Sequence, residues 1–369
     1  MIVERETAGF ALPFIAGVLL AAYSGYGLAS YYLPVPIAAS LSAVLLMHPI
    51  RRRLATEWQW LLIIILAFSA GAICGLTSAY IGVCDTGSYR SLTEWAEGWG
   101  LRMQEAIDRL AFRDKNCNAV AKALITGERC DITKETVMIF RKSGASHILA
   151  LSGLHLGIIY SIITRALSFI GNDRRIWIPR SVFIICVCGF YTLATGAGAS
   201  IVRAYLFICL SEFGRLADRQ RSTAQLFFAA IIIQSAISPS SVKTIGFQLS
   251  YAAMAGIAFI LPWLKSFWPG SIHDDGAFTK VTRKIWDACA MSISCQITTA
   301  PLAYIYFGTV PSNFLLANLL ALPLTGMAIP CILAALALDS FGICPVFVTE
   351  AVELLILTLV RTLEIISAI

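Results

Sequence analysis

Long apolar runs recur along almost the whole chain, and they constrain the fold more than any other feature. A helix that crosses a bilayer needs about 20 mostly apolar residues. The chain is only 14% charged, whereas soluble domains are about a quarter charged, which excludes an ordinary water-soluble globule. We therefore predict an all-α integral membrane protein, a polytopic helical bundle of roughly eleven spans. The runs lie at about 9–25, 31–48, 59–79, 147–170, 181–199, 201–214, 222–238, 244–263, 286–307, 313–338 and 345–366.

The loops between these runs carry a charge bias that orients the bundle. Cytoplasmic loops of membrane proteins are enriched in Lys and Arg, and basic residues here concentrate on the side that would hold the N-terminus. We predict a cytoplasmic N-terminus and an extracytoplasmic segment 80–146. This bias accounts for much of the formal net charge of +6, which by itself does not indicate a nucleic-acid partner. The first run lacks a clean cleavage context and is expected to be retained as a span.

The segment 80–146 has the spacing of amphipathic helices. Its apolar residues from about 92 to 110 recur at steps of three and four. Shorter helices are expected at about 117–126, ended by Gly127, and at about 132–143, capped by Asp131 or Thr133 and ended by Gly144. We predict three parts: N-terminal spans at 1–79, a small amphipathic helical segment at 80–146, and a transmembrane domain at 147–369. A helical cap that merely shields the spans is the alternative role for the middle part.

The cysteines give no metal-ligand spacing. Eight of the eleven lie in or beside apolar runs and are interpreted as small packing residues. Cys84, Cys117 and Cys130 lie in the polar segment, where one disulfide could form in an oxidising compartment. The pairing stays undecided.

The junction at 143–157 is the densest polar cluster beside the membrane runs. On a helix, Ser152 and His155 would share a face, and Gly153 with Gly157 forms a small-xxx-small pair that lets another helix approach. Ionisable groups within a span are costly, so His155 is a functional candidate. The alternative is a neutral His155 that hydrogen-bonds a neighbouring helix.

A second cluster lies at 195–204, where two glycines interrupt an apolar run. Ser200 is expected to cap a new helix with Arg203 as its third residue. A helix N-terminus attracts anions, and an adjacent arginine suits phosphate geometry. The alternative is a tight turn with Arg203 snorkelling to the membrane interface.

Three amides lie within the later runs, namely Gln248, Gln296 and Asn318. Neutral amides in spans commonly bond helix to helix. Together they would also suit a polar path through the bundle.

Several motifs resemble those of one known family. His-Ile-Leu-Ala-Leu-Ser-Gly-Leu-His-Leu-Gly at 147–157, Ile-Val-Arg-Ala at 201–204, Gly-Phe-Gln-Leu-Ser-Tyr at 246–251 and Ala-Asn-Leu-Leu-Ala-Leu-Pro-Leu at 317–324 follow the order and approximate spacing of the competence domain of the ComEC family. The resemblance covers about 100–325 of this sequence.

The resemblance implies a channel in the bacterial plasma (inner) membrane that passes single-stranded DNA into the cytoplasm during natural transformation. It also implies an extracytoplasmic DNA receptor and a cytoplasmic DNA-handling motor as partners, with oligomerisation left open. Its motifs carry over Ser152, Gly153, His155, Arg203, Gln248 and Asn318 as positions that line or shape the conduit. Ser200 and Gln296 join these DNA-path candidates because they neighbour the same features.

The sequence also departs from the family pattern. Between the third and fourth runs there is no room for the five-stranded oligonucleotide-binding barrel that many members carry. The chain has four histidines and no His-x-His-x-Asp-His stretch, so no metallo-β-lactamase-like centre is encoded. We expect a short form of the family with no metal, no cofactor and no enzymatic activity.

Two other functions stay open. An intramembrane serine protease is suggested by serine near histidine, although the usual Gly-x-Ser-Gly elbow is missing and no other histidine is placed to help. A small-anion secondary transporter would use the glycine-broken helix near Ser200 and Arg203.

Overall fold

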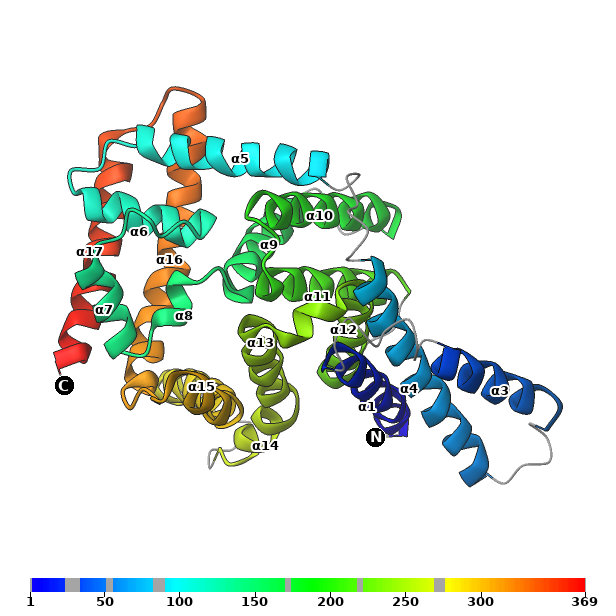
Figure 1. The fold of residues 1–369 in the computed structure, drawn as a ribbon. Coiled ribbons are helices and arrows are strands. Elements are labelled where there is room, and N and C mark those ends of the chain that lie inside the picture. Colours follow the sequence, from blue (N-terminus) through cyan, green and yellow to red (C-terminus); the bar gives the residue numbers. More distant parts are fainter. Residues whose placement is uncertain are drawn as a thin grey trace. The chain divides into compact units, whose positions relative to one another are not determined.

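The regular structure of the chain is helical wherever it is described. The structure is a computed structural model, which describes residues 2–23, 34–50, 56–81, 90–169, 174–217, 222–268 and 276–368, and no β-strand occurs among them. The helices, labelled in Figure 1, are α1 (Ile2–Tyr23), α3 (Pro34–Ile50), α4 (Thr56–Ile81), α5 (Arg90–Arg109), α6 (Lys115–Thr126), α7 (Lys134–Lys142), α8 (Ser146–Leu149), α9 (Gly153–Ser168), α10 (Arg174–Ala194), α11 (Ala199–Leu216), α12 (Thr223–Ile237), η2 (Pro239–Lys243), α13 (Ile245–Ala255), η3 (Gly256–Ile260), α14 (Leu261–Ser266), α15 (Ala277–Phe307), α16 (Phe314–Ser340) and α17 (Val346–Ala368).

The chain divides into two compact units, each assembled from two stretches of sequence. The first comprises Met1–Arg90 and Asp218–Tyr251, and the second comprises Ser91–Ala217 and Ala252–Ile369. The three consecutive parts expected from the sequence, 1–79, 80–146 and 147–369, stay a prediction.

The first unit is built around the close pairing of α1 and α4. A Cβ on Gly17 would meet the backbone carbonyl of Phe68, and a Cβ on Gly71 would meet that of Phe14. Only glycine lets two backbones approach this closely, as in other membrane helix pairs. In the same unit the Tyr251 hydroxyl donates to Gln234 Oε1 at 2.8 Å and joins α13 to α12.

In the second unit, the helices of the polar segment pack on α16 and α17. Phe140 of α7 and Ile148 of α8 are fully buried in one core with Ile332 of α16 and Ile356 of α17. Polar contacts reinforce this packing, since the Asp114 backbone N–H donates to the α17 carboxylate of Glu353 at 2.8 Å, and Arg113 pairs with Glu350. From Ser91 onward, the polar segment is therefore an integral part of the second unit.

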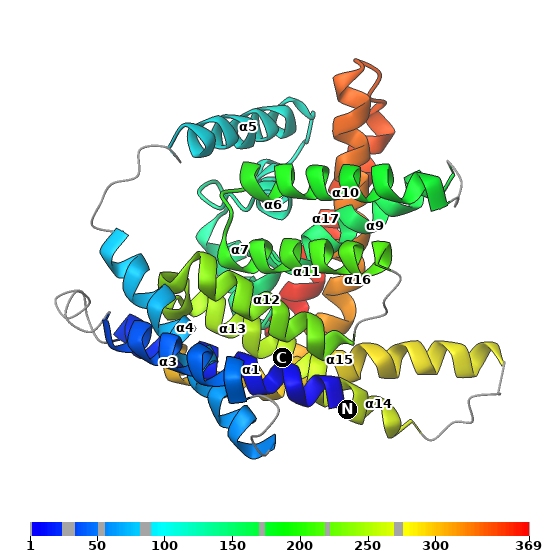
Figure 2. The same ribbon diagram turned by 90° about the vertical axis from the view of Figure 1, so that its right-hand side faces the viewer.

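Helices α9, α10 and α11 form a second group within this unit, and α10 and α11 run side by side in Figures 1 and 2. Leu156, Ile184 and Ile201, one from each helix, share a buried apolar core. The amphipathic helix α5 lies against α10, where the rings of Trp99 and Phe190 meet edge to face with centroids 5.7 Å apart. The sequence-based prediction of an amphipathic helix at this place is confirmed.

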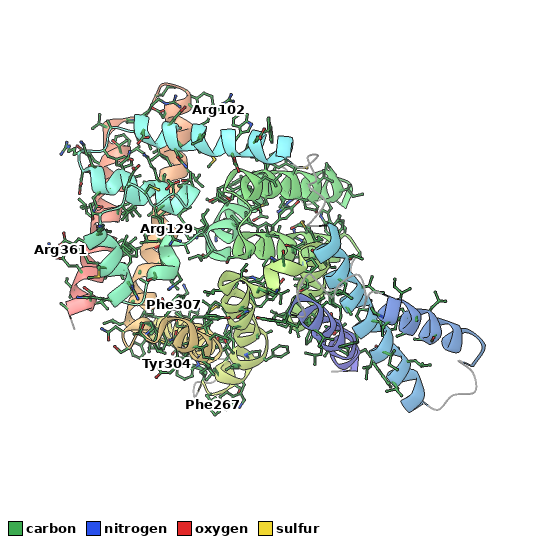
Figure 3. All side chains as sticks on the ribbon, viewed as in Figure 1. Arg102, Arg129, Phe267, Tyr304, Phe307 and Arg361 are labelled. Atoms are coloured by element: carbon green, nitrogen blue, oxygen red, sulfur yellow. The ribbon has the colours of Figure 1, made fainter. Side chains whose placement is uncertain are left out.

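Large apolar side chains cover much of the surface, as expected for helices that contact lipid. On α15, the side chains of Tyr304 and Phe307, labelled in Figure 3, are more than half exposed. In a soluble protein such aromatic residues would mark a binding surface. On long apolar helices they are the expected contacts with acyl chains.

Within the described residues, six helices are long and apolar enough to cross a membrane. They lie at Glu6–Tyr23, Trp60–Ser78, Trp177–Ala194, Ile245–Ser266, Phe278–Phe307 and Phe314–Ser340. Every predicted run overlaps at least one helix, but the count of eleven spans is not confirmed. Helices α3, α9 and α12 have only 17, 16 and 15 residues, and α11 and α17 each carry at least three charged residues.

Candidate functional site

The start of α9 is fixed by a pair of reciprocal hydrogen bonds. Ser152 is the N-cap, and its Oγ accepts the backbone N–H of Leu154 at 3.2 Å. The Nδ1 atom of His155 accepts the backbone N–H of Ser152 at 3.2 Å and lies 3.0 Å from Ser152 Oγ. This is a capping box in which histidine takes the place of the usual glutamate or glutamine. Ser152 and His155 do contact each other, as their spacing suggested, and the contact also builds the helix terminus.

The tautomer of His155 follows from this contact. A backbone N–H only donates, so Nδ1 is the acceptor and a neutral imidazole carries its proton on Nε2. The His155 side chain is fully buried, and Nε2 has no hydrogen-bond partner among the described residues. Buried donors are normally satisfied, so Nε2 is a donor available to an acceptor that enters the bundle.

Gly153 brings the start of α9 against α11. A Cβ on Gly153 would lie 3.2 Å from Ala204 Cβ and 3.6 Å from Arg203 Nη2, whereas a Cβ on Gly157 would meet nothing within 4 Å. The expected close approach of a neighbouring helix therefore occurs at Gly153 alone. The guanidinium of Arg203 is consequently held beside the first turn of α9.

The turn between α10 and α11 positions Arg203. Gly196 and Ala197 have φ values of 82° and 48°, a left-handed geometry in which a non-glycine residue such as Ala197 is uncommon. The predicted break at the glycines is confirmed. The predicted cap is wrong, because Gly198 is the N-cap and α11 begins at Ala199, one residue before Ser200.

Ser200 and Arg203 nevertheless lie together in the first turns of α11. Arg203 is 7% exposed, and its Nη2 lies 3.4 Å from Ser200 Oγ. The N-termini of α9 and α11 add the positive ends of two helix dipoles, worth roughly half a charge each. Together with the Arg203 guanidinium, they give the junction a positive electrostatic potential.

The polar segment supports this junction from outside the helical group. The Tyr191 hydroxyl of α10 donates to the carbonyl of Ile125 at 2.6 Å, and Arg129 Nε donates to the carbonyl of Leu149 at 3.0 Å. Gly127 ends α6 with φ 79° and lies directly against Leu151. The segment that leads into α9 is thus fixed by contacts with α6 and with the residues that follow it.

Comparison with known proteins identifies the family. A family model described as "Competence protein" matches residues 124–369, which is two thirds of the chain. The chain belongs to the competence protein family. All eight DNA-path candidates lie within the matched residues.

The curated proteins to which the chain is similar are much longer than the chain itself. The chain is 25% identical over 230 residues to the uncharacterized protein YcaI of Escherichia coli, which covers 61% of this chain and 30% of that protein. It is 25% identical to ComE operon protein 3 of Bacillus subtilis, covering 53% and 24%, and 23% identical to Recombination protein 2 of Haemophilus influenzae, covering 69% and 33%. The chain thus spans about a third or less of these relatives. No solved structure matches it.

The amides of this competence protein do not all gather at the α9–α11 junction. Gln248 belongs to the first unit, where its Nε2 donates to the carbonyl of Val242 at 3.1 Å. Gln296 is half-buried on α15, beside Cys295. Asn318 lies on α16, and its Oδ1 is buried without a hydrogen-bond partner among the described residues. A continuous path through these amides stays a prediction.

Among the described residues, the buried charged side chains that were not singled out from the sequence include Glu212 and Lys122. Glu212 is 0% exposed on α11 and accepts hydrogen bonds of 2.7 Å from the hydroxyls of Tyr160 and Ser181. A carboxylate inside the run 201–214 was the available signal, because ionisable residues in apolar runs are rare.

Lys122 holds the polar segment together. Its Nζ lies 2.8 Å from both Asp108 and Asp131, and these bonds raise the pKa of the ammonium. Nearby, Cys117 is buried and Cys130 is exposed, and both are free thiols. Cys84 lies outside the described residues, so a disulfide that includes it stays a prediction.

Proposed function

We propose that this chain forms a membrane passage through which single-stranded DNA enters the cytoplasm during natural transformation. Membership of the competence protein family supports a role in DNA uptake, and so do the names of the relatives ComE operon protein 3 and Recombination protein 2. The six long apolar helices support a location in the bacterial inner membrane. The bias of basic loops supports a cytoplasmic N-terminus.

The observation that carries the proposal is the electropositive junction between α9 and α11. Gly153 leaves room for the Arg203 guanidinium beside the α9 N-terminus, and the His155 Nε2–H has no acceptor in the part of the chain that the structure describes. Each nucleotide of a strand brings one phosphate, which accepts hydrogen bonds and carries a negative charge. One arginine and one neutral donor attract such a backbone without a dense cluster of charges that would stall it.

A passage of this kind acts by translocation and not by catalysis. Ser152 Oγ does lie 3.0 Å from His155 Nδ1, which is the reach of a nucleophile and its base. In a serine hydrolase, however, a third group orients the other nitrogen of the histidine, and none of the described residues takes this place at Nε2. The hydroxyl also serves as the cap of α9. The Ser152→Ala variant tests the protease alternative. A loss of peptide cleavage in this variant, with DNA uptake intact, would favour the protease.

The proposed partners follow from the same role. A passage by itself neither captures DNA at the cell surface nor pulls it through the membrane. An extracytoplasmic DNA receptor and a cytoplasmic DNA-handling motor would therefore act on either side of it. Assembly of several copies around one strand is compatible with the exposed apolar helices but is not required by the geometry of the second unit.

The decisive experiment separates binding of DNA from its entry. A strain that lacks the gene is given radiolabelled duplex DNA, and surface-bound and nuclease-protected label are measured. We expect surface binding to persist while protected label and transformants are lost, and expression of this chain alone should restore them. Undiminished transformation in the deletion strain would refute the proposal.

A further inference from the structure

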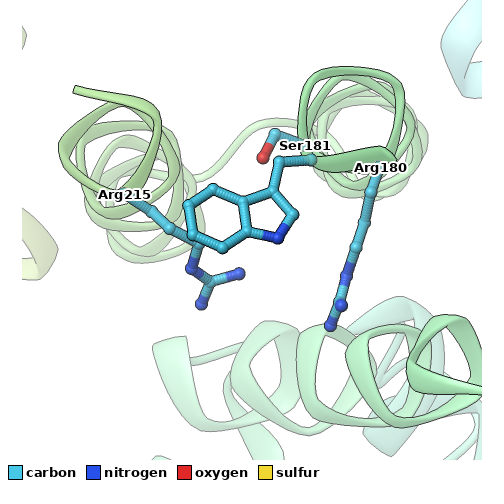
Figure 4. A pocket seen from close by; sticks show the side chains of 4 residues that line it. Arg180, Ser181 and Arg215 are labelled. Atoms are coloured by element: carbon cyan, nitrogen blue, oxygen red, sulfur yellow. The ribbon is translucent and has the colours of Figure 1, made fainter. Parts of the chain in front are cut away.

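A pocket between α10 and α11 is not used by the proposed passage. It has a volume of about 330 Å³ and is lined by Trp177, Arg180, Ser181 and Arg215. In Figure 4 the side chains of Arg180 and Arg215 extend in the same direction from two neighbouring helices, one on either side of the opening. Two guanidinium groups in one small pocket suit a phosphate, which accepts hydrogen bonds on several oxygens.

Both arginines are held in place by polar contacts. Arg180 Nη2 donates to the α9 carbonyl of Thr164 at 3.0 Å, and its Nε is buried without a hydrogen-bond partner among the described residues. Arg215 Nη1 lies 3.2 Å from Glu212, and Arg215 Nη2 lies 3.3 Å from the hydroxyl of Tyr160. The pocket is therefore built before any ligand arrives.

The same contacts set the charge of the pocket. Glu212 neutralises one of the two guanidinium charges, so one formal positive charge remains among the described residues of the pocket. A single negative phosphate diester balances this charge. A polyanion such as a nucleoside triphosphate would need further cations.

The surroundings of the pocket are apolar and exposed. Ile178 and Val182 follow the pocket residues along α10 and are 63% and 52% exposed, and Phe213 of α11 is 58% exposed. Trp177 begins the apolar stretch Trp177–Ala194, and tryptophan is enriched where a span meets the head groups. The pocket thus lies at the level of lipid phosphates, with room for acyl chains beside it.

We propose that this pocket binds the phosphate of an anionic phospholipid, with its acyl chains along the exposed faces of α10 and α11. Basic pockets between membrane helices bind such head groups elsewhere. The bound lipid would brace the α10–α11 pair from the end opposite the turn at Gly196. This inference is independent of whether DNA passes through the chain.

The test compares lipids of different charge on the purified full chain. The protein is placed in phosphatidylcholine nanodiscs with increasing phosphatidylglycerol, and retained lipids are counted by native mass spectrometry. We expect preferential retention of phosphatidylglycerol. Arg180→Gln should weaken it about tenfold, since a charged hydrogen bond is lost, and Arg180→Lys should weaken it less. Arg361→Gln is the matched control, because Arg361 is an exposed arginine on α17.

Three results would overturn the proposal. Equal retention of the two lipids would exclude a charge-selective site, and an equal loss in Arg361→Gln would exclude this pocket. Displacement of phosphatidylglycerol by millimolar inorganic phosphate or by a short single-stranded oligonucleotide would assign the pocket to a free anion or to DNA. If Arg180→Gln lowers the melting temperature, the comparison rests on Arg180→Lys, which keeps the charge and should still bind more weakly than the wild type.

Discussion

An added Cβ on Gly153 would stand 3.6 Å from Nη2 of Arg203, so the first turn of α9 and the guanidinium from α11 occupy one small space. The α9 backbone and the α11 charge therefore depend on each other. A larger side chain at Gly153 should therefore disturb the packing of α9 on α11. A substitution that removes the charge of Arg203 should reduce DNA uptake.

The Arg203→Gln variant should lower entry of labelled DNA about tenfold, because one charged hydrogen bond to a phosphate is worth roughly 1.5–3 kcal/mol. The amount of protein in the membrane should stay unchanged on immunoblots. The control is Arg361→Gln, whose guanidinium is exposed and pairs only with Glu364 in the described structure. Loss of the Arg203→Gln protein from the membrane would instead make Arg203 a structural residue.

Gly153→Ala should destabilise the purified protein by about 1 kcal/mol, since the new methyl group presses on Ala204. Gly157→Ala is the matched control on the same helix. It meets open space and replaces a glycine in a helix interior, so it should be neutral or stabilise by up to about 1 kcal/mol. Thermal melting in detergent measures both variants. Equal melting temperatures would show that α9 and α11 do not approach at Gly153.

Glu212→Ala should cost about 3–5 kcal/mol, because it leaves two hydroxyl donors and Arg215 without their buried carboxylate. Glu212→Gln should cost less, since it keeps the volume and an acceptor oxygen. Glu364→Ala removes an exposed partner of Arg361, and such pairs are worth less than about 1 kcal/mol. A melting curve in which Glu212→Ala and Glu364→Ala coincide would contradict the buried network.

Stability should fall at high pH because of Lys122. The two aspartates raise the pKa of Lys122 above its ordinary value of 10.5, so its contribution is complete below that value and is lost as pH rises through the raised pKa. In Lys122→Met, part of the alkaline fall in melting temperature should disappear. Lys115→Met, at an exposed position of the same helix, should keep the wild-type profile. Identical profiles for the two variants would contradict the stabilising role of the ion pairs between Lys122 and the two aspartates.

A membrane-impermeant maleimide should label Cys130 in intact spheroplasts, because Cys130 is exposed and the segment 80–146 is predicted to be extracytoplasmic. Glu128 raises the pKa of this thiol, so labelling is best done at mildly alkaline pH. Cys117 is buried and should react only after denaturation. Labelling of Cys130 solely in inside-out vesicles would reverse the predicted orientation.

Local signals in the sequence predicted local structure well. Gly127 and Gly144 end their segments with positive φ, and Thr133 caps α7 as one of the two proposed residues. These features depend on a few neighbouring residues. The start of α11 was misplaced by two residues because Gly198 and Ser200 are both acceptable caps, and only the geometry of the preceding turn decides between them.

Contacts between distant residues could not be predicted in this way. Lys122 is charged among apolar neighbours on α6, but its partners Asp108 and Asp131 lie 14 and 9 positions away. Glu212 meets Tyr160 from 52 positions away. The close approach of α11 to α9 was predicted from the small-xxx-small pattern. The pattern does not tell which of the two glycines, Gly153 or Gly157, makes the contact.

The bonds that tie Ile125 to Tyr191 and Arg129 to Leu149 limit how this protein can be recombined with its relatives. A chimera that exchanges the chain at residue 146 would separate donors from acceptors and place a foreign residue against Gly127. Functional exchange should succeed only when α6 and the segment through Tyr191 come from the same parent. The two stretches therefore have to be exchanged together, although the sequence analysis placed them in two consecutive parts, an amphipathic helical segment and a transmembrane domain.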